Sequence, residues 1–246
     1  MTLRVYRLTR CVVRSIGPFS LKNSLSLSLL LAAVGVTAAP GTRGLAEPAY
    51  RLVCGTDSLS GAREVLRALI QEFTLLAMWA SFQDTLLNLR STVLLHLGKR
   101  RYWWSFITVS AVVLAFAYWC GLVFVVLAAS LLVERPVIGV GETSAALVMR
   151  SLGGSSLLLW QAALSQTLRE SRLPLFLMML QTAIAVAASW RPAAWPWLPS
   201  SYGMWCRVRD LQAPPLFTSS AAVVGIALVL IAIGWGAGRA CVRFYD

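Results

Sequence analysis

A long uncharged segment limits the folds open to this chain more than any other feature. From Trp103 to Leu132 the sequence contains no Asp, Glu, Lys, Arg, His, Asn, Gln or Pro. A helix needs about 20 apolar residues to cross the hydrocarbon of a bilayer, and this segment is longer than that. The segment therefore predicts an integral membrane protein.

The residues around the start of this segment are typical of the lipid headgroup level, where cations meet phosphates and aromatic rings lie at the interface. The cations are Lys99, Arg100 and Arg101, and the predicted aromatic anchors are Tyr102, Trp103 and Trp104. The order of basic, aromatic and apolar residues predicts that the chain enters the membrane here from the cytoplasmic side.

The composition agrees with a membrane protein. The 246 residues are 58% hydrophobic and 13% charged, whereas soluble domains are roughly 45–50% apolar and about 25% charged. The net charge of +12 does not indicate nucleic-acid binding, because the cations are scattered between apolar segments and form no basic face. Cations at loop ends are instead typical of membrane topology.

Hydropathy predicts an all-α membrane protein with six transmembrane helices in one domain over 19–246. The predicted spans are 19–39, 65–87, 103–127, 145–167, 174–189 and 219–238. The fourth span is weak because Arg150, Gln161 and Gln166 dilute it, and the fifth is short. Cations are denser in the segments that face the cytoplasm if the N-terminus is inside, with Arg150 and Arg207 counted among the outer-loop cations. Both termini are therefore predicted to be cytoplasmic.

The N-terminal residues 1–18 allow more than one interpretation. Arg4, Arg7, Arg10 and Arg14 would share one side of a helix, which predicts an amphipathic helix in the cytoplasmic interface. The alternatives are a signal peptide with a small-residue cleavage site at 37–39, and an unstructured tail.

No catalytic, metal or cofactor site is predicted. The single histidine, His96, lies in a cytoplasmic connection, and no His, Cys or carboxylate cluster has metal spacing. Glu72, with Gln71 and Gln161, is a candidate for a translocation path, because charged residues within spans are expensive. The alternatives are a carboxylate that reaches the interface and glutamines that only bond between helices.

Two outer regions carry further hypotheses. Cys54 and Cys206 both fall on the predicted outer side, where a disulfide persists, but the sequence does not fix their separation. The segment 190–218 alternates aromatic residues with prolines. It predicts short broken helices, with Trp195 and Trp197 as interfacial anchors; a substrate gate is the alternative.

Residues 82–87 (FQDTLL) and 95–104 (LHLGKRRYWW) resemble the second and third spans, and their basic connection, in six-span permease subunits of type-2 ATP-binding-cassette exporters. The basic N-terminus, the short basic turn at 169–174, the proline-rich outer segment and the charged tail are similar too. His96 departs from the family, where many members carry Arg.

This resemblance implies a membrane subunit of the bacterial cytoplasmic membrane that is not itself an enzyme. Its partners would be a separate ATPase and a second copy or paralogue of the permease. The segment 88–102 would dock into the ATPase through Arg90, His96, Lys99, Arg100 and Arg101. Simple charge anchoring of the last three is the alternative. A membrane scaffold or sensor that transports nothing is the alternative function.

Overall fold

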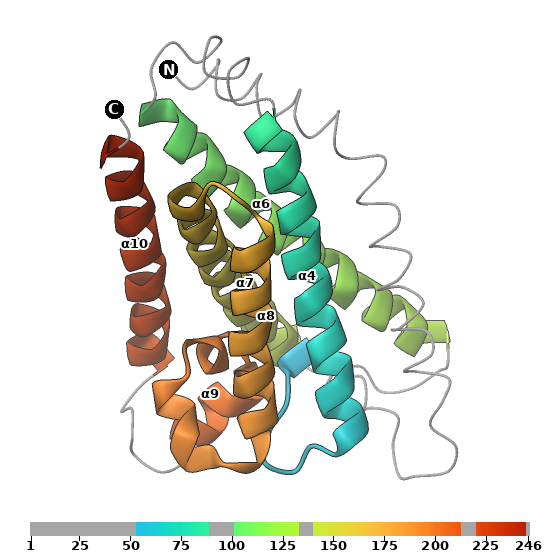
Figure 1. Ribbon diagram of the computed structural model, residues 1–246. Helices are drawn as coiled ribbons and strands as arrows, with labels where there is room; N and C mark the ends of the chain where they lie inside the picture. The colour runs from blue at the N-terminus through green and yellow to red at the C-terminus, as the bar shows by residue number, and fades with distance from the viewer. Residues whose placement is uncertain (1–52, 89–100, 133–139, 213–219, 245–246) are drawn as a thin grey trace.

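The computed structural model describes residues 53–88, 101–132, 140–212 and 220–244, which form an antiparallel helical bundle (Figure 1). Its long helices are α4 (Ala62–Asn88), α6 (Arg101–Leu132), α7 (Val140–Leu168), α8 (Arg172–Ala187) and α10 (Ser220–Phe244). Each corresponds to one of the five predicted spans after residue 60. The part of the chain described contains no strand. The predicted N-terminal helix over 1–18 and the first span over 19–39 lie outside the described residues.

Short helices cover one end of the bundle. They are η1 (Ala188–Trp190), η2 (Pro192–Trp197), η3 (Pro199–Gly203) and α9 (Trp205–Gln212), and we call residues 188–212 the cap. Prolines begin η2 and η3 and interrupt η2, because proline cannot continue the hydrogen-bonding pattern of a helix. The prediction of short broken helices before the last span is therefore confirmed.

Three of the described helical segments are long and apolar enough to cross a membrane: Ala62–Leu86, Trp103–Ala128 and Arg172–Trp190. The apolar part of α10, Val224–Ala240, is shorter. Their length and composition support a helical membrane protein.

Helix α7 is the centre of the bundle. It contacts α4, α6, α8, α9, α10 and η3. Between Met149 and Gln166 the residues of α7 are buried or half-buried on every side of the helix. Its buried polar side chains therefore face other helices and not lipid, which explains how Arg150, Gln161 and Gln166 are accommodated within this helix.

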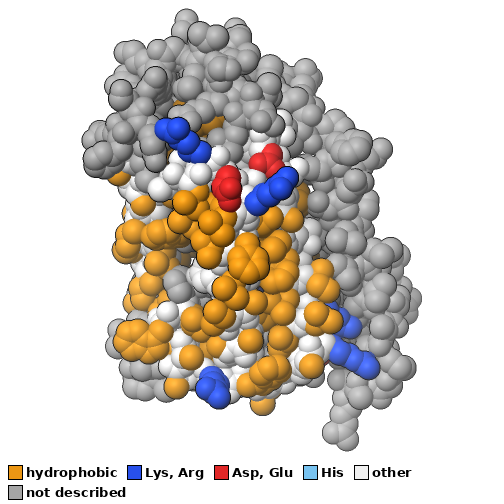
Figure 2. All heavy atoms as spheres, in the orientation of Figure 1, with side chains coloured by type: hydrophobic (Ala, Val, Ile, Leu, Met, Phe, Trp, Pro, Cys, Tyr) orange, Lys and Arg blue, Asp and Glu red, His pale blue; other side chains and the backbone are white. Residues whose placement is uncertain are grey.

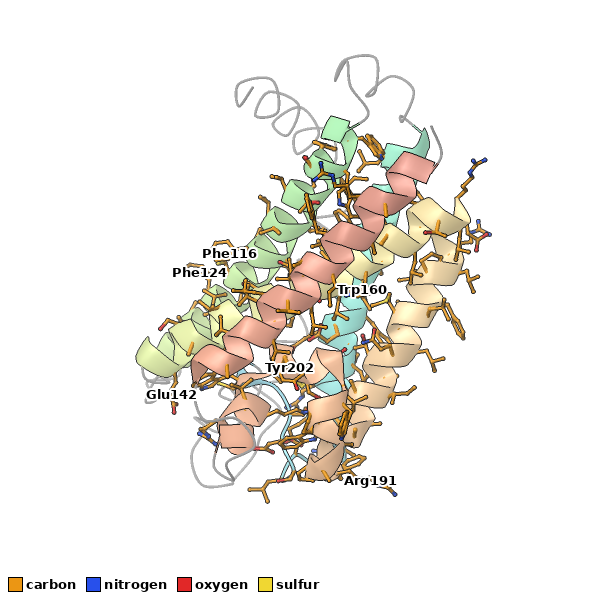
Figure 3. All side chains as sticks on the ribbon, turned by 90° about the vertical axis from the view of Figure 1, so that its left-hand side faces the viewer. Phe116, Phe124, Glu142, Trp160, Arg191 and Tyr202 are labelled. Carbon is orange, nitrogen blue, oxygen red and sulfur yellow. The ribbon has the colours of Figure 1, made fainter. Side chains whose placement is uncertain are left out.

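The outward faces of α6 and α8 carry large apolar side chains. Phe116 and Phe124 of α6 point away from the other helices (Figure 3). On α8 the exposed residues include Phe176, Leu180 and Ile184. Figure 2 shows such side chains over the middle of one face, with charged side chains toward its two ends. This distribution suits a helix bundle surrounded by hydrocarbon.

A tight turn joins α7 to α8 at the end away from the cap. Arg169 adopts a left-handed backbone conformation with φ of 56°, which is a common way to end a helix. The Ser171 hydroxyl, directly before α8, bonds to the Asp84 carboxylate of α4. The turn thereby places α8 beside α4 as well as α7.

Candidate functional site

Four charged side chains are buried near the cap end of the bundle, and one of them, Asp57, accepts hydrogen bonds from Leu59 and Ser60 of its own turn. The other three are Glu72 on α4, Arg150 on α7 and Arg207 on α9, and we call these three the charge cluster. A buried charge is costly unless it is paired and hydrogen-bonded, so the partners of each residue define what the cluster does.

Glu72 and Arg150 form an ion pair across α4 and α7. The Nη1 atom of Arg150 lies 2.6 Å from Oε1 of Glu72. Arg150 also donates from Nε to the carbonyl of Val53, over 3.2 Å. Glu72 therefore does not extend to a lipid interface, and the pair links α4, α7 and the segment before α4.

Aromatic and glycine residues shape the surroundings of Arg150. Its guanidinium carbon lies 4.5 Å from the centroid of the Trp119 ring, within range of a cation–π interaction. A Cβ atom at Gly154 would lie 2.9 Å from Nε1 of Trp119. Gly55, with φ of +99°, would bring a Cβ atom within 2.8 Å of Met204 and 3.3 Å of Arg150. Gly154 therefore lets α6 approach α7, and Gly55 lets the segment before α4 approach Met204 and Arg150.

Arg207 attaches the cap to the bundle. Its Nη1 donates to the carbonyl of Ala185 (2.7 Å) and the hydroxyl of Ser201 (2.9 Å). Its Nε and Nη2 donate to the carbonyl and hydroxyl of Thr56, each over 3.0 Å, and Nη2 also donates to the Ser189 hydroxyl over 2.7 Å. Carbonyls in the last turn of a helix have no partner within that helix, so Arg207 satisfies the end of α8 while holding α9 against it.

The charge on Arg207 has no carboxylate partner among the ion pairs of the described residues. Burial, followed by repulsion from Arg150, lowers the pKa of Arg207 to about 10. The guanidinium therefore stays charged at neutral pH. Hydroxyl and carbonyl oxygens stabilise its positive charge by accepting hydrogen bonds. The Trp195 ring, whose centroid lies 5.2 Å away, stabilises it further.

The two cysteines of the disulfide hypothesis meet beside this cluster. Cys54 and Cys206 are both fully buried, and both are thiols. The Cys54 thiol donates a hydrogen bond to the sulfur of Cys206, which lowers the pKa of Cys206 against the opposing effect of burial. The segments that carry the two cysteines, residues 53–56 and 204–207, contact each other through Gly55, Thr56 and Met204.

The glutamines of the path hypothesis lie on the same two helices, Gln71 directly before Glu72 on α4 and Gln161 eleven residues after Arg150 on α7. Gln71 is buried beside Glu72, and Gln161 is fully buried on α7. The amide of Gln161 donates to the carbonyl of Leu76 over 3.4 Å. Polar side chains thus follow the α4–α7 contact, but inside the bundle and not on its lipid-facing side.

The predicted aromatic anchors divide into two groups. Trp197 is 84% exposed, and its role as an interfacial anchor stays a prediction. Trp103, Trp104 and Trp195 are buried in the protein, which corrects the prediction that they face the headgroups. Trp104 shows the reason: its Nε1 donates to the carbonyl of Trp235, over 2.8 Å, so packing against α10 satisfies its polar atom.

The predicted coupling residues Arg90, His96, Lys99 and Arg100 lie outside the described residues. Arg101 begins α6, but its side chain and that of Tyr102 are outside the described part. The last residue of α4 and the first of α6 both lie at the end of the bundle opposite the cap (Figure 1). The connection between them therefore starts and finishes at that end.

Sequence reasoning missed the roles of Arg150 and Arg207, which it treated as outer-loop cations. One signal was available for the first. Glu72 stands ten residues after Ala62 and Arg150 ten residues after Val140, so two opposite charges occur at equal depth, about 15 Å along helices that start at the same end. No comparable signal identifies Arg207, whose partners come from four separate segments.

The interactions within the charge cluster are ion pairing, hydrogen bonding and cation–π contacts. Within the described ranges no group of three or more His, Cys, Asp or Glu residues could hold a metal ion. The chain matches no family model, no curated protein and no solved structure.

Proposed function

We propose that this chain is the membrane subunit of an ATP-binding-cassette exporter of the bacterial cytoplasmic membrane, moved by a separate ATPase subunit. In this proposal six helices span the membrane, both termini are cytoplasmic and the cap faces outward. A second copy or a paralogue completes the membrane unit, and the lipid bilayer covers the remaining apolar surface.

One observation carries the proposal: the two ends of the bundle are built differently. The cap end is closed by buried Arg207 and its hydrogen bonds, whereas α4 ends and α6 begins at the opposite end (Figure 1), on either side of the basic sequence 89–100. An ATPase that bound this connection would push on two long helices at once. The polar contact between α4 and α7 would then receive the motion, in keeping with rigid-body alternating access.

Gln71, Glu72 and Gln161 keep a conditional role in this proposal. All three lie within one bundle, so they would line a translocation path only when α4 and α7 separate. Buried atoms that lack a hydrogen-bond partner in the described chain, Oε2 of Glu72 and Nη2 of Arg150, provide bonding capacity for a polar group in such a state.

Charge reversal tests the docking role. Arg100→Glu together with Arg101→Glu should abolish co-purification of the ATPase and its stimulation by the membrane subunit, because like charges would face the docking surface. The matched control reverses Arg63 and Arg191, which are exposed at the cap end, and should retain both. Normal ATPase assembly with the first variant would refute the coupling assignment.

The alternative function is a membrane scaffold or sensor that recruits cytoplasmic partners through the same basic connection. A scaffold would bind its partner without changing the rate of ATP hydrolysis. Purification from native membranes, followed by measurement of ATPase activity with and without this chain, separates the two functions.

A further inference from the structure

The cap and the segment before α4 are held together by more than Arg207. Residues 53–56 and 204–207 run beside each other: Gly55 abuts Met204, and the Thr56 hydroxyl donates to the Met204 sulfur over 3.5 Å. Arg207 donates a hydrogen bond to the carbonyl of Thr56, and Arg150 donates one to the carbonyl of Val53. Cys54 and Cys206 lie in the middle of this contact, so both cysteine backbones are held in place by their neighbours.

We propose that Cys54 and Cys206 form a disulfide in the mature protein, which covalently joins the segment before α4 to α9 of the cap. The two thiols are fully buried. A disulfide requires Cα atoms within about 7 Å and Cβ vectors that converge. The residues next to the cysteines are in contact, since Gly55 abuts Met204 and Thr56 bonds both Met204 and Arg207.

The oxidation requires a thiol–disulfide oxidoreductase as the electron acceptor. The Cys206 thiolate attacks the disulfide of that enzyme and forms a mixed disulfide, and Cys54 then attacks the Cys206 sulfur. Cys54 and Cys206 are joined, the oxidoreductase leaves as a dithiol, and the two thiol protons end on its two sulfurs. Because both cysteines are inaccessible in the folded chain, the exchange takes place before the cap closes on the bundle.

This inference rests on the proposed orientation, since disulfides persist on the outer side of the membrane and thiols stay reduced in the cytoplasm. It adds a covalent link to the end of the bundle that is proposed to stay closed. The loop that it closes contains α4, α6, α7 and α8, so reduction would remove this covalent link and leave the cap held by the hydrogen bonds of Arg207.

The test counts thiols in the full-length protein, which has five cysteines. Cells are quenched in acid and denatured, and free thiols are alkylated with a maleimide reagent of known mass before and after reduction. We expect three labelled cysteines before reduction and five after it, and a cross-linked peptide pair 2 Da lighter than its two components, as loss of two hydrogens requires. Five labels before reduction, or a metal bound by the two thiols, would overturn the disulfide.

Two controls separate this outcome from the proposed orientation. C54S/C206S should give three labels under both conditions. Trp197→Cys, at an exposed position of the cap, should react with a membrane-impermeant maleimide on intact cells if the cap faces outward. If Cys54 and Cys206 are reduced while position 197 reacts on intact cells, only the disulfide is refuted. If position 197 reacts only after the cells are permeabilised, the proposed orientation is refuted too.

Discussion

Helices α6 and α7 lie against each other but differ in their surroundings, because α6 exposes one face whereas α7 is enclosed by other helices. Helix α6 carries no charged residue after Arg101, and its face with Phe116 and Phe124 is exposed while the face with Phe106 and Ala115 is buried. Helix α7 carries Arg150, Gln161 and several serines but has protein on nearly every side. Hydropathy therefore indicates whether a helix contacts lipid. A helix that is enclosed by other helices scores as a weaker membrane span, because its polar side chains face protein.

The largest expected effect comes from breaking the ion pair that supports α7. Arg150→Leu leaves Glu72 charged and buried without a partner, and we expect it to lower the free energy of unfolding by about 3–5 kcal/mol. Thermal unfolding of the purified protein in detergent measures the change. The double variant Glu72→Leu, Arg150→Leu should recover much of the loss, because it removes both charges. If the single variant were as stable as the exposed control Arg191→Leu, the pair would not support the packing of α7.

The two faces of α6 should respond differently to the same substitution. Phe106→Ala creates a cavity at a fully buried site and should cost about 3 kcal/mol. Phe124→Ala, at a residue that is 72% exposed, should change the free energy of unfolding by less than about 1 kcal/mol, because lipid or detergent fills the space. Equal losses for the two variants would show that Phe124 is covered by protein, for example by a second copy of the chain.

A smaller effect is expected where α10 packs on α6. A Cβ atom at Gly238 would lie 2.0 Å from the Trp104 ring, whereas nothing lies within 4 Å of that position at Gly236. Gly238→Ala should therefore destabilise the bundle by about 2 kcal/mol. Gly236→Ala should be neutral or stabilise it by up to about 1 kcal/mol, because alanine favours a helix. Thermal unfolding compares the pair, and the reverse order would contradict the burial of Trp104.

Much of the fold could be predicted from the sequence. The apolar segments gave helices over all five of the predicted spans that the structure describes, and the prolines of 190–218 gave the broken helices of the cap. These features depend on local composition and on backbone chemistry. The site was less predictable: Glu72, Cys54 and Cys206 were recognised as candidates, but Arg150, the partner of Glu72, lies 78 residues away in the sequence and was counted as an outer-loop cation.

The sequence by itself determined that the chain is helical, where most of its helices lie and that an apolar surface must be covered. Only the tertiary structure decided which helix stands in the middle, which tryptophans face inward and which charges are paired. The reason is physical. Helix formation and transfer into hydrocarbon depend on local sequence, whereas the cost of a buried Arg150 or Arg207 depends on oxygens that other segments bring to it.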